Sequence, residues 1–452
     1  MRSVNPATEE TIREYPDHSL EEVDEKLDLA LSAFDFWRGT TFEERGLLLG
    51  RAAEVLRRRK GELAALMTAE MGKVVVQAEA EVEKCAWVCE HYAEKAAAYL
   101  APEEIATDAS RSLVRFDPLG PVLAVMPWNF PLWQVFRFAA PALMAGNVGI
   151  LKHASNVPGC ALAVEEVFRE AGLPKGAFQT LLVGSSVVEG IVRHPAVKAV
   201  TLTGSDGAGR ALAAAAGAVL KKTVLELGGS DPFLVLKDAD LPRAAQVAAQ
   251  ARCINNGQSC IAAKRFIVEA PVFDAFERAF VTAMSSLSVG DPMDRKTDVG
   301  PLARQDLLED LHDQVYRSLK GGAVLKCGGK RLPRRGFFYP PTVLSRVEPG
   351  MAVFEEETFG PAAALVRAED ADHAVALANA SPFGLGASLW TADLALAQRL
   401  AGEIEAGSVF VNGMVKSDPR LPFGGVKLSG YGRELSAFGI REFVNVKTVW
   451  VA

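Results

Sequence analysis

From residue 121 onward, short apolar runs alternate with helical stretches, and this alternation constrains the fold more than any other feature of the sequence. A first series contains strand-like runs at 122–126, 148–152, 178–183 and 199–202, each followed by a helix-like stretch. Strands joined through helices pair in parallel by right-handed crossovers, and helices then cover both faces of the sheet. The sequence therefore predicts an α/β fold.

A second series of the same kind begins after Gly229. Its strand-like runs lie at 233–236, 265–268, 323–326, 363–366, 387–390 and 408–411. Residues 19–100 differ, because their apolar positions recur at spacings of three and four and predict consecutive helices. The length of 452 residues allows about three domains at about 150 residues each, and the two series predict two α/β domains that meet near residue 228.

Two β-prone segments stand apart from both series. One lies at 112–116, and the other, at 443–451, ends the chain without a neighbouring strand in sequence. The terminal segment is expected either to reach another subunit or to form an edge strand within its own chain. Both arrangements remain open at this stage.

Charge and composition exclude several classes of protein. The net charge is −7 and no Lys/Arg cluster offsets it, which argues against a nucleic-acid partner. The six cysteines form no C-x-x-C pair and the six histidines are scattered, so neither a disulfide scaffold nor a metal site is expected. The most apolar stretch, 121–133, is too short to span a bilayer, and the N-terminus lacks the apolar core of a signal peptide. We expect a cytoplasmic protein without a membrane partner.

A cysteine and a glutamate offer the parts for covalent catalysis. Cys260 ends the stretch Asn-Gly-Gln-Ser-Cys at 256–260, and Glu226 lies in the apolar-flanked turn Leu-Glu-Leu-Gly-Gly at 225–229. A thiolate is a strong nucleophile, and a positioned carboxylate can activate it or a water molecule. Taken alone, both residues have an ordinary alternative, because most cysteines are small buried hydrophobes and most glutamates are solvated.

Other polar residues follow the strand-like runs of the first series. Asn129 stands in Pro-Trp-Asn-Phe-Pro at 127–131, and its amide could hold an oxyanion or bond its own backbone. The turn Thr-Gly-Ser at 203–205 opens an alanine-rich helix, where a phosphate could bind or where tight packing could require the glycine. Lys152 ends another run and could approach a ribose or a phosphate, or remain a surface lysine.

Seven motifs, in this order, resemble those of the aldehyde dehydrogenase superfamily, and the resemblance covers about residues 5–450. They are Pro-Trp-Asn-Phe-Pro at 127–131, Leu-Lys at 151–152, Thr-Gly-Ser at 203–205, Leu-Glu-Leu-Gly-Gly at 225–229, Asn-Gly-Gln-Ser-Cys at 256–260, Glu-Thr-Phe-Gly-Pro at 357–361 and Pro-Phe-Gly-Gly-Val-Lys-Leu-Ser-Gly at 422–430. The resemblance implies an aldehyde-dehydrogenase-like α/β fold with two intertwined parallel-sheet domains, a small β oligomerisation arm, and a homodimer or homotetramer. The implied parts are an NAD(P)-binding domain at 1–97 and 119–228, a catalytic domain at 229–428, and an arm with a C-terminal strand at 98–118 and 429–452.

The same resemblance implies a role for each catalytic residue. Cys260 is expected to form a thiohemiacetal with an aldehyde and then a thioester. Asn129 and the backbone N–H of Cys260 are expected to hold the oxyanion, and Glu226 to activate the hydrolytic water. This order is chemically reasonable, because hydride leaves readily from a tetrahedral alkoxide and the thioester then needs an activated water.

The resemblance also implies a dinucleotide site. The residues expected at this site are Trp128, Lys152, Ser155, Thr203, Gly204, Ser205, Glu357 and Phe359. Gly204 and Ser205 would hold the pyrophosphate, Lys152 and Glu357 the two riboses, and Phe359 would position the nicotinamide ring. Many NAD-preferring relatives carry a glutamate at the position of Ser155, so we expect both cofactors to be accepted and NADP to be preferred.

The expected substrate follows from one face of a helix. Trp133 and Arg137 lie four and eight residues after Asn129 and point back toward it. Arg137 could pair with the far carboxylate of a short substrate, or it could belong to a structural ion pair. Arg137 and Ser417 match carboxylate-binding positions of bacterial succinate-semialdehyde dehydrogenases, which the chain resembles in these details.

One departure from that group leaves the substrate open. Some members carry an arginine where this chain has Ile254, so a broader specificity, including glutarate semialdehyde and simple aliphatic aldehydes, is the alternative expectation. CoA-acylating chemistry is disfavoured because it needs no hydrolytic base such as Glu226. A catalytically silent protein on the same fold is disfavoured by the joint presence of the implied catalytic and cofactor residues.

Overall fold

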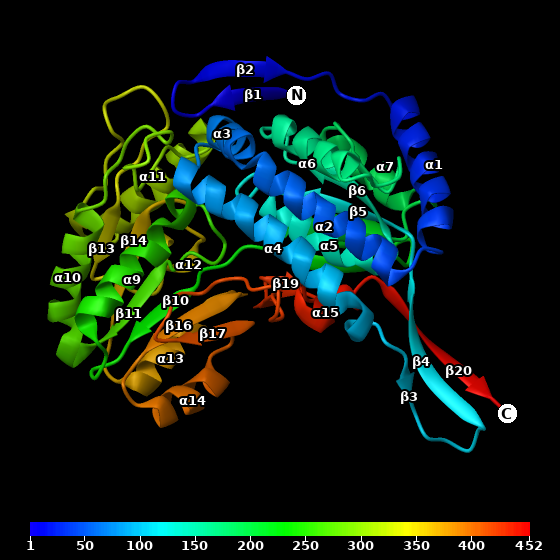
Figure 1. Cartoon of the computed structure of the whole chain (residues 1–452). Coiled ribbons are helices and arrows are strands. Elements are labelled where there is room, and N and C mark those ends of the chain that lie inside the picture. The colour runs from blue at the N-terminus through cyan, green and yellow to red at the C-terminus, as the bar shows by residue number, and fades with distance from the viewer.

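The computed structural model describes all 452 residues, which begin with a hairpin and a group of helices (Figure 1). These elements are β1 (Arg2–Asn5), β2 (Glu10–Glu14), α1 (Leu20–Trp37), α2 (Phe42–Arg58), α3 (Lys60–Met71) and α4 (Val75–Tyr99). The first two helices start at capping boxes, in which Ser19 pairs with Glu22 and Thr41 with Glu44. The predicted helices are confirmed, whereas the hairpin was not predicted from the sequence.

The first α/β series forms a six-stranded sheet. In spatial order its strands are β19 (Gly430–Tyr431), β9 (Lys222–Glu226), β8 (Ala199–Thr203), β5 (Pro121–Met126), β6 (Val148–His153) and β7 (Phe178–Thr180). All neighbours pair in parallel except β19, which is antiparallel to β9. The helices that follow these strands are α5 (Trp133–Met144), α6 (Pro158–Glu170), α7 (Val188–Arg193) and α8 (Asp206–Gly217). The carboxyl ends of the five parallel strands therefore meet at one edge, where ligands of open α/β sheets bind.

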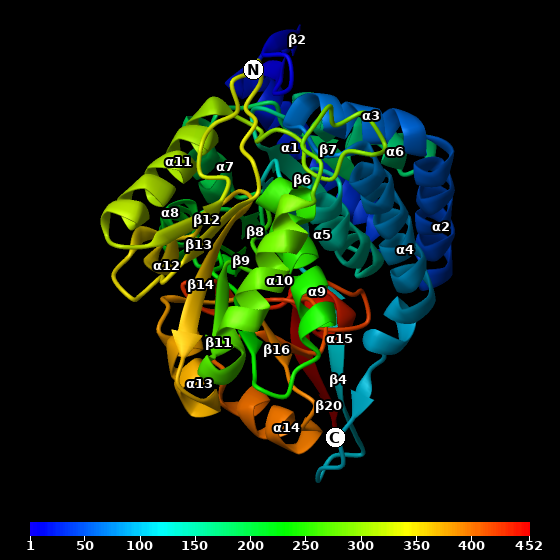
Figure 2. The same ribbon diagram turned by 90° about the vertical axis from the view of Figure 1, so that its left-hand side faces the viewer.

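The second series forms a seven-stranded sheet. Its order is β12 (Val324–Cys327), β13 (Thr342–Ser345), β14 (Ala362–Ala368), β11 (Arg265–Glu269), β10 (Pro232–Val235), β16 (Gly386–Trp390) and β17 (Ser408–Val411). The associated helices are α9 (Leu241–Cys253), α10 (Phe273–Ser285), α11 (Gln305–Lys320), α12 (Ala352–Glu355), α13 (Ala371–Asn379) and α14 (Leu394–Glu403). Figure 2 shows α9 and α10 side by side on this part of the molecule.

Burial on β10 shows that this sheet is covered on both faces. Phe233 and Val235 belong to one hydrophobic cluster, whereas Leu234 between them belongs to another. This separation is expected, because successive side chains of a strand point to opposite faces. The continuous apolar run at this position therefore gave a correct prediction of a doubly covered strand.

Three features of the sheets differ from the sequence prediction. The strands β9 and β13 were not predicted, and β12 pairs antiparallel to β13 rather than in parallel. β9 has the sequence Lys-Thr-Val-Leu-Glu, and its charged ends leave an apolar run that is too short to be recognised as a strand. β12 lies at the sheet edge and is joined to β13 through a loop instead of a helix, so no crossover forces parallel pairing.

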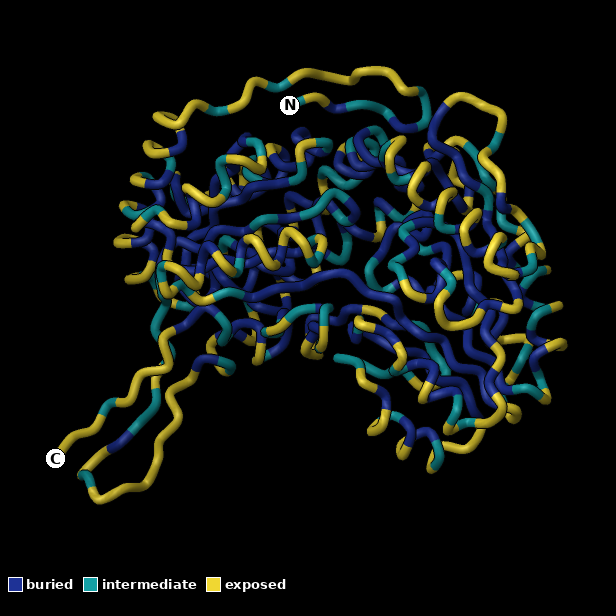
Figure 3. Tube along the Cα trace, turned by 180° about the vertical axis from the view of Figure 1, so that it is seen from behind, coloured by how far each residue is buried: buried dark blue, intermediate teal, exposed yellow.

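A β arm extends from the body of the molecule (Figure 3). It consists of β3 (Glu103–Glu104), β4 (Arg111–Pro118) and β20 (Val444–Val451), with β20 antiparallel to β4. The C-terminal segment thus forms an edge strand within its own chain, which was one of the two arrangements left open. Its outer positions are exposed, with Val446 at 61% and Trp450 at 54%.

Smaller elements join the arm to the body. Of the range 429–452, β19 belongs to the six-stranded sheet, and α15 (Ser436–Ile440) contacts α4 and α5. A short pair, β15 (Phe383–Gly384) and β18 (Val426–Lys427), lies between the two series. None of the helices combines the length and the apolar composition that a bilayer crossing requires.

Candidate active site

The predicted site residues lie where the carboxyl edge of the six-stranded sheet meets the amino edge of the seven-stranded sheet. Trp128 and Asn129 follow the carboxyl end of β5, whereas Gln258 and Phe359 precede the amino ends of β11 and β14. The Nδ2 of Asn129 donates to the carbonyl of Gln258 at 3.1 Å. The rings of Trp128 and Phe359 meet edge to face, with centroids 5.7 Å apart. The site therefore lies at the junction of the two sheets.

The loop that carries Cys260 depends on three consecutive left-handed residues. Asn255, Asn256 and Gly257 have φ values of 53°, 58° and 77°. Asparagine and glycine are the residues that adopt this region most readily. A Cβ on Gly257 would also lie 2.3 Å from the carbonyl carbon of Gly360, so no larger residue fits without displacement. The Asn-Asn-Gly sequence is therefore a structural requirement of the loop.

Both asparagine side chains fasten the loop to the rest of the molecule. The Nδ2 of Asn256 donates to the carbonyls of Gly72 at 2.8 Å and Pro301 at 3.0 Å. The Nδ2 of Asn255 donates to the carbonyl of Asn129 at 2.6 Å. Because these acceptors come from separate parts of the chain, the loop is held from several sides.

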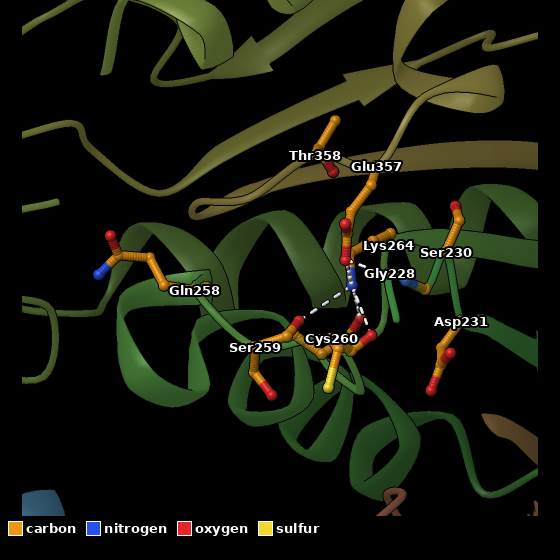
Figure 4. Close-up of polar contacts among 12 residues, drawn as sticks. Gly228, Ser230, Asp231, Gln258, Ser259, Cys260, Lys264, Glu357 and Thr358 are labelled. Carbon is orange, nitrogen blue, oxygen red and sulfur yellow. Dashed lines mark hydrogen bonds and ion pairs between the residues drawn. The ribbon is translucent and has the colours of Figure 1, made fainter. Parts of the chain in front are cut away.

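A buried lysine organises the backbone around the thiol (Figure 4). The Nζ of Lys264 donates to the carbonyls of Ser259, Cys260 and Ala262 at 3.0, 2.8 and 3.0 Å. The same ammonium lies 3.8 Å from the carboxylate of Glu357, and burial lowers the pKa of Lys264. The carbonyls of the loop are thus turned toward Lys264, while the backbone N–H of Cys260 donates to no protein acceptor.

The Cys260 thiol opens into a cavity of about 230 Å³. Residues of α4, of α5 and of the segments 254–261 and 415–423 line it, including Lys84, Trp133, Arg137, Cys260, Ser417 and Phe423. Burial raises the pKa of Cys260 to about 12, and the nearby charges of Arg137 and Lys264 lower it in part. The resting thiol is therefore protonated, and its proton must leave as the sulfur attacks.

Glu226 ends β9 as a buried carboxylate without partners. Its side chain is 2% exposed, and neither carboxylate oxygen has a hydrogen-bond partner. Burial raises its pKa well above the ordinary value, Glu434 raises it further, and Arg137 and Arg433 lower it. A carboxyl group of raised proton affinity is a suitable general base near neutral pH.

Arg137 lies in the cavity wall and also forms the ion pair that was the alternative expectation. Its Nε is in contact with the Glu434 carboxylate, and its guanidinium lies 4.6 Å from the centroid of the Phe423 ring. Its Nη2 donates to the Thr203 hydroxyl at 3.4 Å. Thr203, expected in the cofactor site, thus contacts the arginine of the substrate cavity.

The remaining cofactor candidates lie along the carboxyl edge of the six-stranded sheet. Lys152 is largely buried at the end of β6, has no carboxylate within 4.0 Å, and burial lowers its pKa. Ser155 and Ser205 are exposed. The Ser205 hydroxyl caps α8 by accepting from the N–H of Ala208 at 3.3 Å. Glu357 accepts the N–H of Gly229 at 3.0 Å and remains partly exposed.

The polar groups along this edge are suited to binding a dinucleotide. An unpaired ammonium and an exposed glycine-serine turn before a twelve-residue helix suit phosphate groups, and a carboxylate suits ribose hydroxyls. Gly207 in the first turn of that helix leaves open space where a Cβ would stand. The structure thus places the expected cofactor residues Lys152, Ser155, Gly204 and Ser205 on one edge.

Sequence reasoning missed four charged residues of the site: Lys84, Lys264, Glu81 and Glu434. Glu81 accepts the N–H groups of Leu132 and Trp133, both at 2.9 Å, and its other oxygen contacts Lys73. It therefore fixes the start of α5. Lys264 and Glu434 each follow a recognised motif by four residues, whereas Lys84 and Glu81 lie far from any of them.

The comparisons with known proteins agree with this geometry. A family model described as the aldehyde dehydrogenase family matches residues 1–449. A Synechocystis sp. protein, named as a probable NADP(+) succinate-semialdehyde dehydrogenase, is 56% identical over 452 residues and all of both chains. An NADP(+) succinate-semialdehyde dehydrogenase of Mycobacterium tuberculosis is 53% identical, also over all of both chains. The crystal structure of the Streptococcus pyogenes succinic semialdehyde dehydrogenase with NADP+ superposes with a TM-score of 0.97 at 35% identity, covering 100% of this chain and 99% of the other.

Proposed function

This chain belongs to the aldehyde dehydrogenase family, and we propose that it oxidises succinate semialdehyde to succinate with NADP through a thioester on Cys260. The observation that carries the proposal is the single cavity that joins the Cys260 thiol to cationic side chains. An aldehyde that ends in a carboxylate satisfies both ends of such a cavity. The names of the relatives described above point to the same substrate.

The first step forms a bond between the Cys260 sulfur and the aldehyde carbon. The thiol proton leaves as this bond forms, and the carbonyl oxygen becomes an alkoxide. The backbone N–H of Cys260 and the Nδ2 of Asn129, which has a second N–H besides the one given to Gln258, donate to that oxygen. The thiol proton passes to solvent in the cavity, and Glu226, whose proton affinity is raised by burial, is kept for the hydrolytic step.

The second step converts the adduct into a thioester. A bound oxidised nicotinamide would supply the two-electron oxidant, as the acceptor of the hydride that leaves the former aldehyde carbon. Lys152 and Glu357 would hold the riboses, the turn at Gly204 and Ser205 the pyrophosphate, and the ring of Phe359 would limit where the nicotinamide can lie. The carbon–oxygen double bond reforms while the bond to the sulfur remains.

The last step hydrolyses the thioester. Glu226 takes a proton from a water molecule, whose oxygen attacks the thioester carbon. The carbon–sulfur bond then breaks, the product leaves as a carboxylate, and the sulfur regains a proton. The two unpartnered oxygens of Glu226 leave it free for this water.

The preference for NADP rests on Ser155. Its side chain is exposed beside the strand end that carries Lys152. A serine there leaves room for a 2′-phosphate and offers a hydroxyl donor, and Lys152 adds positive charge. NAD, which lacks this phosphate, is accepted less well.

We further propose that the chain forms a homodimer or a homotetramer through the β arm. The outer positions of β20 expose Val446, Trp450 and Val451, and edge strands with exposed apolar residues favour pairing. All six cysteines are free, which suits the reducing cytoplasm as the place of action. Light scattering after size exclusion should give two or four times the mass of 48.4 kDa.

A panel of aldehydes tests the proposed reaction. Succinate semialdehyde, glutarate semialdehyde and butanal are compared with NADP and NAD by the absorbance of the reduced nicotinamide. The highest kcat/KM is expected for succinate semialdehyde with NADP. A higher kcat/KM for butanal would contradict a carboxylate-specific site. A higher kcat/KM for glutarate semialdehyde would contradict the proposed length of the substrate's carbon chain.

A further inference from the structure

Most charges around the substrate cavity are neutralised by partners within the protein. Arg137 is in contact with Glu434, and Glu226 adds a second carboxyl group near the same guanidinium. Glu81 contacts Lys73, which is fully buried. These charges are matched inside the protein, so they contribute little net attraction for a substrate anion.

The acidic residue next to the cavity is matched as well. Asp418 follows Ser417 and pairs with Arg420 at 2.7 Å. Lys416 lies at the cavity but is exposed, so solvent screens its charge. One largely buried cation remains without a counter-ion, and it is Lys84.

Lys84 lies on α4, and its side chain lines the cavity next to Trp133 of α5. Its Nζ lies 4.3 Å from the centroid of the Trp133 ring and donates to the Ser417 hydroxyl at 2.7 Å. No carboxylate lies within 4.0 Å of it. Burial, and to a smaller extent the charge of Arg137, lower its pKa to about 8. A largely buried ammonium without a counter-ion is strongly stabilised when an anion binds beside it.

The Ser417 hydroxyl completes a two-donor arrangement. Its oxygen accepts from Lys84, so its own proton is free to be donated to a ligand. An ammonium and a hydroxyl side by side can each donate to one oxygen of a carboxylate. The aromatic face of Trp133 keeps the ammonium in place and limits the space around it.

We infer that Lys84, together with Ser417, binds the carboxylate of the substrate and is the residue that selects ω-carboxy aldehydes. This inference rests on the proposed function, because it assumes a substrate with a carboxylate at the end opposite to the aldehyde. It assigns to Arg137 a second role, which is to hold Glu434 and the cavity wall. Specificity then depends on the one largely buried cation of this cavity that has no counter-ion.

The test is the ratio of kcat/KM for succinate semialdehyde to that for butanal in Lys84→Met. Methionine keeps an unbranched chain of similar length and removes the charge. The ratio should fall at least about tenfold, since a hydrogen bond to a charged group contributes that much or more. The loss should appear mainly as a higher KM for succinate semialdehyde. Lys84→Arg, which keeps the charge, should recover part of the ratio.

A matched control separates this effect from a general change in α4. Lys95 lies on the same helix, is half exposed and pairs with Glu94 away from the cavity, so Lys95→Met should leave the ratio unchanged. A Lys84→Met enzyme with an unchanged ratio, or with equal losses for both substrates, overturns the inference. Wild-type enzyme that does not prefer succinate semialdehyde to butanal overturns the proposed substrate, and the inference with it.

Discussion

The loop that carries the nucleophile and the edge that would hold the cofactor differ in how their polar groups are satisfied. In the loop, Lys264 gives three hydrogen bonds to carbonyls, and Asn256 gives two more. At the cofactor edge, Lys152 has no counter-ion and Ser155 is exposed. The protein thus fixes the position of the reacting atom with its own hydrogen bonds, and it leaves Lys152 and Ser155 available to a ligand.

The substrate cavity combines both properties. Arg137 is paired with Glu434 and resembles the loop, whereas Lys84 has no counter-ion and resembles the cofactor edge. If this distinction is correct, substitutions in the loop should reduce turnover for every substrate. Substitutions of unpaired groups should instead change the choice of ligand.

The largest effect is expected from the nucleophile itself. Cys260→Ser should lower kcat by roughly a thousandfold or more with every aldehyde, because the serine hydroxyl is a far weaker nucleophile in the same position. Steady-state rates measure the loss. Cys327→Ser changes a half-buried cysteine outside the cavity and should retain full activity. Substantial activity in the Cys260 variant would show that another residue forms the adduct.

A smaller but uniform loss is expected from Lys264→Met. Three loop carbonyls lose their common donor, which should misplace the thiol and reduce kcat by roughly a hundredfold for succinate semialdehyde and butanal alike. Unpaired buried carbonyls should also lower the free energy of unfolding by about 3 kcal/mol. Chemical denaturation and rate assays measure the two effects.

The exposed Lys330, which forms no ion pair and no side-chain hydrogen bond, provides the control for that substitution as Lys330→Met. Its activity and stability should match the wild-type protein. A Lys264 variant with wild-type kcat would mean that the loop keeps its position without the ammonium. The contrast between the two regions would then lose its basis.

A change of preference is expected at the cofactor edge. Ser155→Glu places a carboxylate where the 2′-phosphate of NADP is expected, and like charges at contact repel by about 1 to 4 kcal/mol. The kcat/KM for NADP should therefore fall at least roughly tenfold, whereas that for NAD should be retained. Equal losses with both cofactors would place Ser155 away from the phosphate.

The smallest effect is a pH dependence of substrate choice. Below about pH 8 Lys84 is protonated and attracts the substrate carboxylate, and above it this charge is lost. The groups that face Lys84 are Arg137, which lowers its pKa, and Cys85, Glu81 and Asp418, which raise it. The kcat/KM for succinate semialdehyde relative to butanal should thus fall as the pH rises through about 8. A constant ratio between pH 7 and 9 would contradict this.

The repeated strand–helix units could be predicted from the sequence, because buried parallel strands are short continuous apolar runs. β9 was missed because it has charged ends, and β13 because it follows two prolines and has only two apolar residues between Thr342 and Ser345. The position of Cys260, Glu226 and Asn129 at one junction was expected only through the family resemblance. Apolar periodicity alone does not show which loop ends meet.

The charges that complete the site could not be predicted in the same way. Lys84 on α4 and Ser417 in the segment after β17 are far apart in the sequence, and only the tertiary structure brings them together. Whether Arg137 binds a substrate or pairs internally depends on Glu434, which lies in the C-terminal part of the chain. Pairing of buried charges is a property of the tertiary structure, so the sequence left both alternatives open.

The covalent route through Cys260 is tested most directly by trapping the thioester. Glu226→Gln keeps the size of the side chain and removes the base for hydrolysis, so the acylated enzyme should accumulate. Intact-protein and peptide mass spectrometry after mixing with succinate semialdehyde and NADP should show one succinyl group, attached at Cys260, together with a burst of reduced nicotinamide. An unmodified Cys260 peptide, or a succinyl group on another residue, would contradict the account.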